Sequence, residues 1–180
     1  MQQSREHQVP ASVEIFLVED NPADILLFKR ILRMTCLAHG LTISSDGTDA
    51  LERLENRGGG RPYRPDVIFL DLNLPGKPGA EVLATLKADP LLASIPVAVL
   101  TGSDNPDDPA TCSSLGAALF LNKPVFFEQF SVLASAIERF VTEALSAKRS
   151  EPEAQLQAVA AGQILTAPGT CSPAAPLRRT

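Results

Sequence analysis

The chain has 180 residues, of which 44% are hydrophobic and 21% are charged, the balance of one folded globular domain. Its formal net charge of -5 excludes the basic field that non-specific nucleic-acid binding requires, so no nucleic-acid partner is expected. No run reaches the roughly 18 apolar residues of a membrane span, and the first residues lack a signal-peptide core. We therefore predict a cytoplasmic protein without membrane contact.

Three cysteines occur at widely separated positions, Cys36, Cys112 and Cys171, and none belongs to a CxxC pair. Their number and spacing indicate neither a disulfide framework nor a zinc site. We expect three free thiols.

Apolar runs and amphipathic segments alternate five times along the chain, which is the pattern of a parallel sheet covered on both faces by helices. The first strand is predicted at 13–18, and the helix after it is capped by Asn21 and opened by Pro22. A weaker strand at 41–45 precedes a short helix, for which Thr48 is the expected cap.

The middle of the chain continues the same alternation after a loop. Three glycines and two prolines predict that 57–65 holds no regular element. Further strands are predicted at 67–70, 96–100 and 118–121, separated by a helix that ends at Asp89–Pro90 and a short polar helix at 107–115.

The last helix is expected to be the longest, because apolar residues recur along it at spacings of three and four. These residues are Phe127, Phe130, Leu133, Ile137, Val141 and Leu145. The helix is predicted to end near Ala147. We therefore expect a flexible leader at 1–12, one domain at 13–147 and a disordered Ala- and Pro-rich tail at 148–180.

Polar residues follow the predicted strands at their carboxyl ends, where doubly wound sheets place their sites. Glu19 and Asp20 follow the first strand, Asp71 the third, Thr101 the fourth, and Lys123 lies just after the fifth. Three clustered carboxylates repel one another, so their natural companion is a hard divalent cation such as Mg²⁺.

A carboxylate beside such a metal can attack phosphorus, and Asp71 is the best placed nucleophile. Phosphoryl transfer mainly needs positioning and neutralisation of charge, which Mg²⁺, the Lys123 ammonium and the Thr101 hydroxyl would supply. Taken singly, each residue is explained as a helix cap, a turn former or a solvated charge. Their joint occurrence at four strand ends favours the functional interpretation.

Four segments carry a resemblance to the receiver domain of response regulators: FLVEDNPAD, FLDLNLPGKPG, VAVLTGS and LFLNKPVFFEQF. The spacings from Asp71 to Thr101 and from Thr101 to Lys123 are also similar to those of the family. The resemblance runs from about Val13 to Ala147. It implies a flavodoxin-like α/β fold, with a doubly wound five-stranded parallel sheet in the order 2-1-3-4-5.

The resemblance also implies roles for individual residues. Asp71 would be the phospho-acceptor and Glu19 and Asp20 the acid pocket. Asp20, Asp71 and the backbone carbonyl of Asn73 would hold Mg²⁺, with Glu19 acting through water. Lys123 would pair with the phosphoryl group.

Signalling in the family implies that Thr101 is the switch hydroxyl and Phe120 the aromatic that moves with it. The bond between Lys123 and Pro124 would be cis, as in the family. The protein would not be an enzyme beyond its own phosphoryl transfer and dephosphorylation. Its donor would be a sensor histidine kinase, and the wording of the motifs resembles stand-alone regulators that serve bacterial phytochrome kinases.

Two positions depart from the family pattern. Pro78 stands where an Asp usually precedes Gly79, and Phe126 stands where a helix-capping Asp is common. Phe126 beside Phe127 predicts an exposed apolar edge, and we expect a homodimer through the last helix.

Two other classes of function remain as alternatives. A dehalogenase-like phosphatase also uses an aspartyl nucleophile, but it needs a carboxylate two positions on, where this chain has Asn73. A protein-binding or dimerisation module that works without phosphorylation would not need the acceptor set.

Overall fold

The computed structural model describes residues 12–55 and 63–160, and the side chains of these residues up to Lys148. Five parallel strands form one sheet in the order β2-β1-β3-β4-β5, which confirms the predicted fold class. The strands are β1 (Val13–Val18), β2 (His39–Ser44), β3 (Val67–Leu70), β4 (Val97–Thr101) and β5 (Leu119–Asn122). The helices in the described residues are α1 (Pro22–Leu32), α2 (Gly47–Glu55), α3 (Gly79–Ala88), α4 (Asp108–Ser114) and α5 (Gln129–Ala160).

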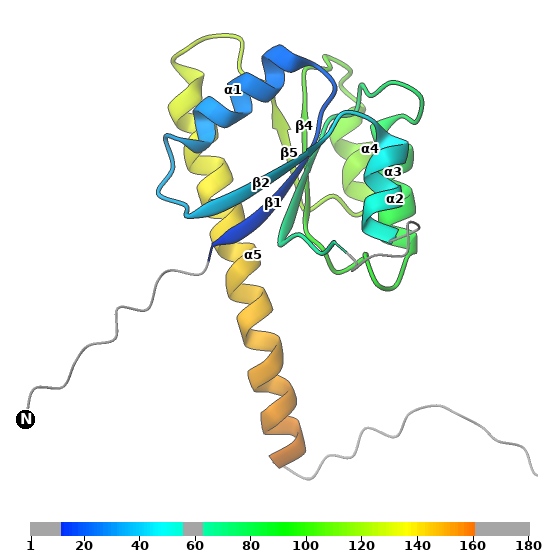
Figure 1. Cartoon of the computed structure of the whole chain (residues 1–180), viewed down its shortest axis with the longest axis vertical. Coiled ribbons are helices and arrows are strands. Elements are labelled where there is room, and N and C mark those ends of the chain that lie inside the picture. The colour runs from blue at the N-terminus through cyan, green and yellow to red at the C-terminus, as the bar shows by residue number, and fades with distance from the viewer. Residues whose placement is uncertain (1–11, 56–62, 161–180) are drawn as a thin grey trace, which may run out of the picture. The chain divides into compact units, whose positions relative to one another are not determined.

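The order of the strands creates a switch point between β1 and β3. From β1 the chain crosses to β2 on one side, and the next crossover brings β3 to the other side of β1. Helices α1 and α2 therefore lie on opposite faces of the sheet, and the carboxyl ends of β1 and β3 lie at the switch point, where doubly wound sheets place their sites. Figure 1 shows this arrangement around the central strands.

Two apolar cores lie on the two faces of the sheet. Helices α1 and α5 cover one face, where Phe28 and Phe140 pack against Phe69 with ring centroids 4.9 and 5.8 Å away. Helices α2, α3 and α4 cover the other face, which includes Leu54 and Leu83. Burial of each such side chain stabilises the fold by about 1.5–3 kcal/mol. The sheet therefore holds the residues at the carboxyl ends of its strands in place.

Helix α1 starts as the sequence predicts, but α2 does not. The Asn21 side chain accepts a hydrogen bond from the Ala23 backbone N–H at 3.0 Å, with Pro22 at the first helical position. For α2 the expected cap was Thr48. Instead, Asp46 Oδ1 accepts hydrogen bonds from the backbone N–H groups of Thr48 and Asp49, because a carboxylate satisfies both donors at the helix start.

Helix α5 is longer than predicted. The chain divides into a compact unit that ends at Ser146 and a second unit from Ala147, and α5 continues through Ala147 to Ala160. The apolar stripe stops near Leu145, and the helix continues through a segment rich in Ala, Glu and Gln that also contains Pro152. The predicted helix end near Ala147 is therefore too early, and the disorder expected for 148–180 stays a prediction.

Several other predictions are only partly covered by the described residues. Most of the predicted leader, residues 57–62 of the predicted loop, and 161–180 lie outside them, as does Cys171. Cys36 and Cys112 are free thiols. No helix in the described part of the chain is long and apolar enough to cross a membrane.

The peptide bond between Lys123 and Pro124 is trans, so the expectation of a cis bond is wrong. All peptide bonds among the described residues have the trans form, which is also the lower-energy form of an X-Pro bond.

Gly79, the first residue of α3, lies against the backbone that follows β3. A Cβ atom at this position would stand 2.0 Å from the Asp71 carbonyl oxygen and 2.7 Å from Leu72 Cα. The Gly79 N–H also donates to the Leu72 carbonyl at 3.0 Å. Only glycine allows this approach, which fixes the loop after Asp71 against α3.

We predict that Gly79→Ala lowers the free energy of unfolding by about 1–3 kcal/mol, because the backbone of Asp71 and Leu72 must shift. Gly102→Ala is the control, since its Cβ would meet only Lys123 Cδ at 3.9 Å and should change stability by less than about 0.5 kcal/mol. Urea unfolding of both variants measures the difference. Equal midpoints would contradict the close-approach explanation.

Candidate functional site

The hydrogen-bond ladder of the sheet continues for one bond past the ends of β1, β3 and β5. It therefore aligns the residues that directly follow these strands. The Glu19 N–H donates to the Ser44 carbonyl at 2.9 Å, and the Asp71 N–H to the Val18 carbonyl at 3.0 Å. On the other side, the Lys123 N–H donates to the Thr101 carbonyl at 2.8 Å. These bonds hold Glu19, Asp71 and Lys123 at one edge of the sheet, as the sequence predicted for adjacent strand ends.

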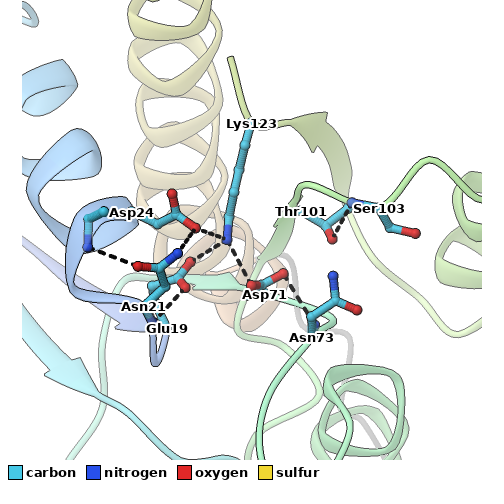
Figure 2. Close-up of polar contacts among 9 residues, drawn as sticks. Glu19, Asn21, Asp24, Asp71, Asn73, Thr101, Ser103 and Lys123 are labelled. Carbon is cyan, nitrogen blue, oxygen red and sulfur yellow. Dashed lines mark hydrogen bonds and ion pairs between the residues drawn. The ribbon is translucent and has the colours of Figure 1, made fainter. Parts of the chain in front are cut away.

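Lys123 forms ion pairs with three carboxylates, as Figure 2 shows. Its Nζ lies 2.7 Å from Glu19 Oε2, 2.7 Å from Asp71 Oδ2 and 2.9 Å from Asp24 Oδ2. A lysine ammonium has three N–H donors. Each of these donors therefore has a carboxylate oxygen as its acceptor.

Two of the three carboxylates that pair with Lys123 are buried, which strengthens these ion pairs. Glu19 is 2% exposed and Asp71 is 4% exposed. Burial alone would lower the pKa of Lys123, but hydrogen bonds to Asp24, Asp71 and Glu19 outweigh it and hold that pKa well above its ordinary value. Burial raises the pKa of Glu19, although the Lys123 ammonium opposes this shift. The lysine therefore stays charged, and the buried carboxylates depend on it.

Three carboxylates stand close enough to share a cation. One oxygen each from Glu19, Asp20 and Asp71 lies within 4.8 Å of the other two. Asp20 is exposed while Glu19 and Asp71 are buried, so the cluster opens to solvent on the Asp20 side. Oxygen donors with several negative charges suit Mg²⁺ or Mn²⁺, and these residues fit such an ion.

Asp71 has both of its oxygens engaged in the described structure. Oδ2 accepts from Lys123, and Oδ1 accepts from the Asn73 backbone N–H at 3.3 Å. The second bond ties the Asp71 carboxylate to the loop that follows β3 (Figure 2). The expected role of the Asn73 carbonyl as a metal ligand stays a prediction.

Thr101 and Phe120 lie apart from the ion pairs. Thr101 is fully buried, and its Oγ1 accepts from the Ser103 N–H at 3.1 Å; no hydrogen bond joins it to Asp71 among the described residues (Figure 2). Phe120 is half-buried against the core under α2, α3 and α4, opposite Val99 in the register. Because side chains alternate along β4, Thr101 belongs to the same face of the sheet as Val99 and Phe120.

Sequence reasoning missed Asp24 as a site residue and gave Asn21 only a capping role. Asp24 lies in the first turn of α1 and contacts Lys123, which is 99 positions away. Asn21 Nδ2 donates to Asp24 Oδ2 at 3.1 Å, while the Asn21 N–H donates to Glu19 Oε1 at 3.1 Å. The available signal was a third acid in the segment that contains Glu19 and Asp20, together with helical spacing.

The start of α5 carries the predicted apolar edge. Val125 and Phe126 are 81% and 64% exposed. Phe127 packs on Phe130 with ring centroids 5.1 Å apart, and the Arg30 guanidinium lies 5.4 Å from the Phe127 ring. Beside this edge is an open groove of about 250 Å³. Its lining is Leu121, Asn122, Lys123, Pro124, Gln129, Val132, Leu133 and Ala136.

The arrangement combines a buried carboxylate, a fixed ammonium and an acid cluster suited to a divalent cation. Such a group can present Asp71 to an incoming phosphoryl group while positive charges neutralise its oxygens.

Comparison with known proteins agrees with this arrangement. Residues 15–137 match the family model described as response regulator receiver domain. Response regulator Rcp1 of Synechocystis sp. strain PCC 6803 is 39% identical over 133 residues, which span 73% of this chain and 90% of that protein.

Solved structures give the same result. The phosphorylated cyanobacterial phytochrome response regulator RcpA is 41% identical, with a TM-score of 0.66, over 73% of this chain and 95% of that chain. The Mn²⁺-bound form of Rcp1 is 40% identical, with a TM-score of 0.65, over 71% and 93%.

We predict that Mg²⁺ stabilises the native protein, by about 2.7 kcal/mol when its concentration is 100 times the Kd. The raised pKa of Glu19 means that the metal-free native state takes up a proton before the unfolded state does as pH falls from 7 towards 4.5. Acidification therefore favours the metal-free fold and weakens Mg²⁺ binding. Thermal unfolding with and without Mg²⁺ at matched ionic strength should show a shift that shrinks as pH falls; a constant shift would contradict the assignment of Glu19.

Proposed function

Because the chain belongs to the response regulator receiver domain family, we propose that it takes a phosphoryl group from a sensor histidine kinase onto Asp71 in the cytoplasm. The message would pass on through contact with another protein or along a phosphorelay. The observation that carries this proposal is the buried Asp71 carboxylate, 2.7 Å from the Lys123 ammonium and within the acid cluster. Receiver domain response regulators are typically not true enzymes, as the sequence predicted.

In the proposed transfer, the bond between phosphorus and the kinase histidine nitrogen breaks and a bond to an Asp71 oxygen forms. The histidine keeps the electron pair of the broken bond and takes up a proton. Asp71 needs no base, since a carboxylate is already the nucleophilic form. Lys123 would neutralise negative charge on the phosphoryl oxygens, and the Asn73 N–H would orient the carboxylate.

The proposed cofactor is Mg²⁺, held by Asp20, Asp71 and the Asn73 carbonyl, with Glu19 acting through water. Support comes from the approach of the three carboxylates within 4.8 Å and from the Mn²⁺-bound form of the similar protein Rcp1. When bound, the ion would offset repulsion between the acids and the phosphoryl oxygens.

We further propose that the donor is a phytochrome-type kinase. The phosphorylated regulator RcpA, to which this chain is 41% identical, is described as a cyanobacterial phytochrome response regulator. A second support is the wording of the segments VEDNPAD and KPVFFEQF, which resembles that of stand-alone regulators that serve bacterial phytochrome kinases.

The proposed switch consists of Thr101 and Phe120. Both belong to the face of the sheet that α4 covers, so a displacement of the Thr101 hydroxyl towards a phosphoryl group would open space on the face where Phe120 packs. The added phosphate shifts this balance only to the extent that it binds one arrangement better.

Acetyl phosphate tests the acceptor directly. We predict that the native chain shows a Mg²⁺-dependent shift on a phosphate-affinity gel and that Asp71→Asn shows none, because the amide cannot form the acyl phosphate. Asp104→Asn is the matched control, since it removes an exposed acid outside the cluster and should shift like the native chain. A shift that persists in Asp71→Asn would refute the acceptor assignment, and no shift in any variant would favour a binding module that works without phosphorylation.

We also propose that the chain forms a homodimer through the start of its last helix. Val125, Phe126 and Val132 are large apolar side chains left more than half exposed, and the groove beside them offers a place for side chains of a second copy. Phe127 is 62% exposed but contacts Phe130 and Arg30, so we choose Phe126 as the anchor to test.

Phe126→Ser tests this surface. We predict that the native chain has about twice its 19.2 kDa mass by light scattering at tens of micromolar and that the variant is monomeric, because one exposed aromatic anchor often dominates an interface. Leu91→Ser removes an equally exposed apolar side chain elsewhere and should leave the dimer intact. A monomeric native chain would count against the homodimer.

A further inference from the structure

Asp24 differs from the other two partners of Lys123 in one respect that bears on metal binding. Glu19 and Asp71 both belong to the acid cluster suited to a divalent cation, whereas Asp24 does not. Lys123 therefore pairs with two carboxylates of the proposed metal site, Glu19 and Asp71, and with one carboxylate outside it, Asp24. The ammonium and the metal compete for Glu19 and Asp71, and they also repel each other.

The residues around Asp24 fix its carboxylate in position for the ion pair with Lys123. It lies in the first turn of α1, where the helix dipole favours an acid. Its Oδ2 accepts from Lys123 at 2.9 Å and from Asn21 Nδ2 at 3.1 Å, and Asn21 is itself fixed as the cap of the helix. The carboxylate is therefore presented to Lys123 in one orientation (Figure 2).

From this geometry we propose that Asp24 is a positioning residue that retains the Lys123 ammonium on the α1 side of the site when a divalent cation binds Asp71 directly and Glu19 through water. Without the Asp24 charge, Lys123 binds those two carboxylates more strongly and opposes the metal. The inference rests on the proposed function, because it concerns the metal that assists phosphoryl transfer to Asp71.

The direction of the effect follows from two contributions with the same sign. Removing the negative charge of Asp24 weakens the attraction of the site for any cation. It also leaves Lys123 with Glu19 and Asp71 as its remaining charged partners among the three described ion pairs. Both effects weaken metal binding in Asp24→Asn, although Asp24 is not a ligand of the metal.

Mn²⁺ binding measures the effect without phosphorylation, since free Mn²⁺ gives an electron paramagnetic resonance signal that binding removes. We expect Asp24→Asn to raise the Kd about threefold to tenfold, the effect of losing one partly buried ion pair. Asp24→Glu keeps the charge and should recover most of the affinity. Glu143→Gln removes one charge from the exposed face of α5 and should bind like the native chain.

A double-mutant cycle with Lys123→Met separates positioning from a general loss of charge. If Asp24 acts partly through Lys123, Asp24→Asn should raise the Kd by a clearly smaller factor in the Lys123→Met background than in the native chain, and the remaining effect measures the direct loss of charge. Circular dichroism checks that each variant is folded, and Lys123→Gln serves in the same way if the Met variant does not fold.

Two results would overturn the inference alone: native Mn²⁺ affinity in Asp24→Asn, or an unchanged effect of that substitution in the Lys123 background. If the native chain binds no Mn²⁺, the metal part of the proposed function is wrong and the inference falls with it. The native measurement therefore distinguishes failure of the inference from failure of the function on which it rests.

Discussion

The site depends on one ammonium that serves three carboxylates. Glu19 and Asp71 are almost fully buried, and a buried carboxylate without a partner costs several kcal/mol. Lys123 reaches both, together with Asp24, at 2.7 to 2.9 Å. Because Asp20 adds a fourth carboxylate, a single ammonium leaves the group with excess negative charge. This excess negative charge favours binding of a second cation, and the proposed phosphoryl transfer requires such a cation.

The sheet makes this concentration of charge tolerable. Hydrogen bonds of the ladder extend one residue past β1, β3 and β5, so the side chains after these strands are fixed by backbone and not by loops. Two apolar cores hold the strands from both faces, and Gly79 fixes the first turn of α3 against the loop after Asp71. The stability of the packed fold therefore offsets the repulsion between the clustered carboxylates.

Much of the fold could be predicted from the sequence because its signals are local. Continuous apolar runs identify the strands, and Asn21 with Pro22 identifies the start of α1. Other features depend on surroundings that no local pattern contains. Asp46 caps α2 because its carboxylate reaches two N–H donors at once. The end of α5 was mispredicted because the apolar stripe that was used to place it stops before the helix does.

The candidate site shows the same division. Glu19, Asp71 and Lys123 were predictable because parallel strands end at one edge of the sheet. Asp24 was not, because its contact with Lys123 depends on how α1 packs and on an Asn21 side chain that caps the helix and also donates to Asp24. A residue that looks like an ordinary helix-terminal acid in the sequence becomes part of the charge network only in the folded chain.

The two departures from the family pattern both lie near helix starts. Phe126 cannot cap α5, but Gln129 Oε1 accepts from the backbone N–H groups of Val125 and Phe126 at 2.8 and 3.2 Å. This contact is the reach-back half of a capping box, which satisfies N–H donors before the helix, and position 126 itself carries an exposed aromatic ring. Pro78 makes no side-chain cap, yet its carbonyl accepts from the N–H groups of Glu81 and Val82. Both helices therefore begin without an Asp at these two positions.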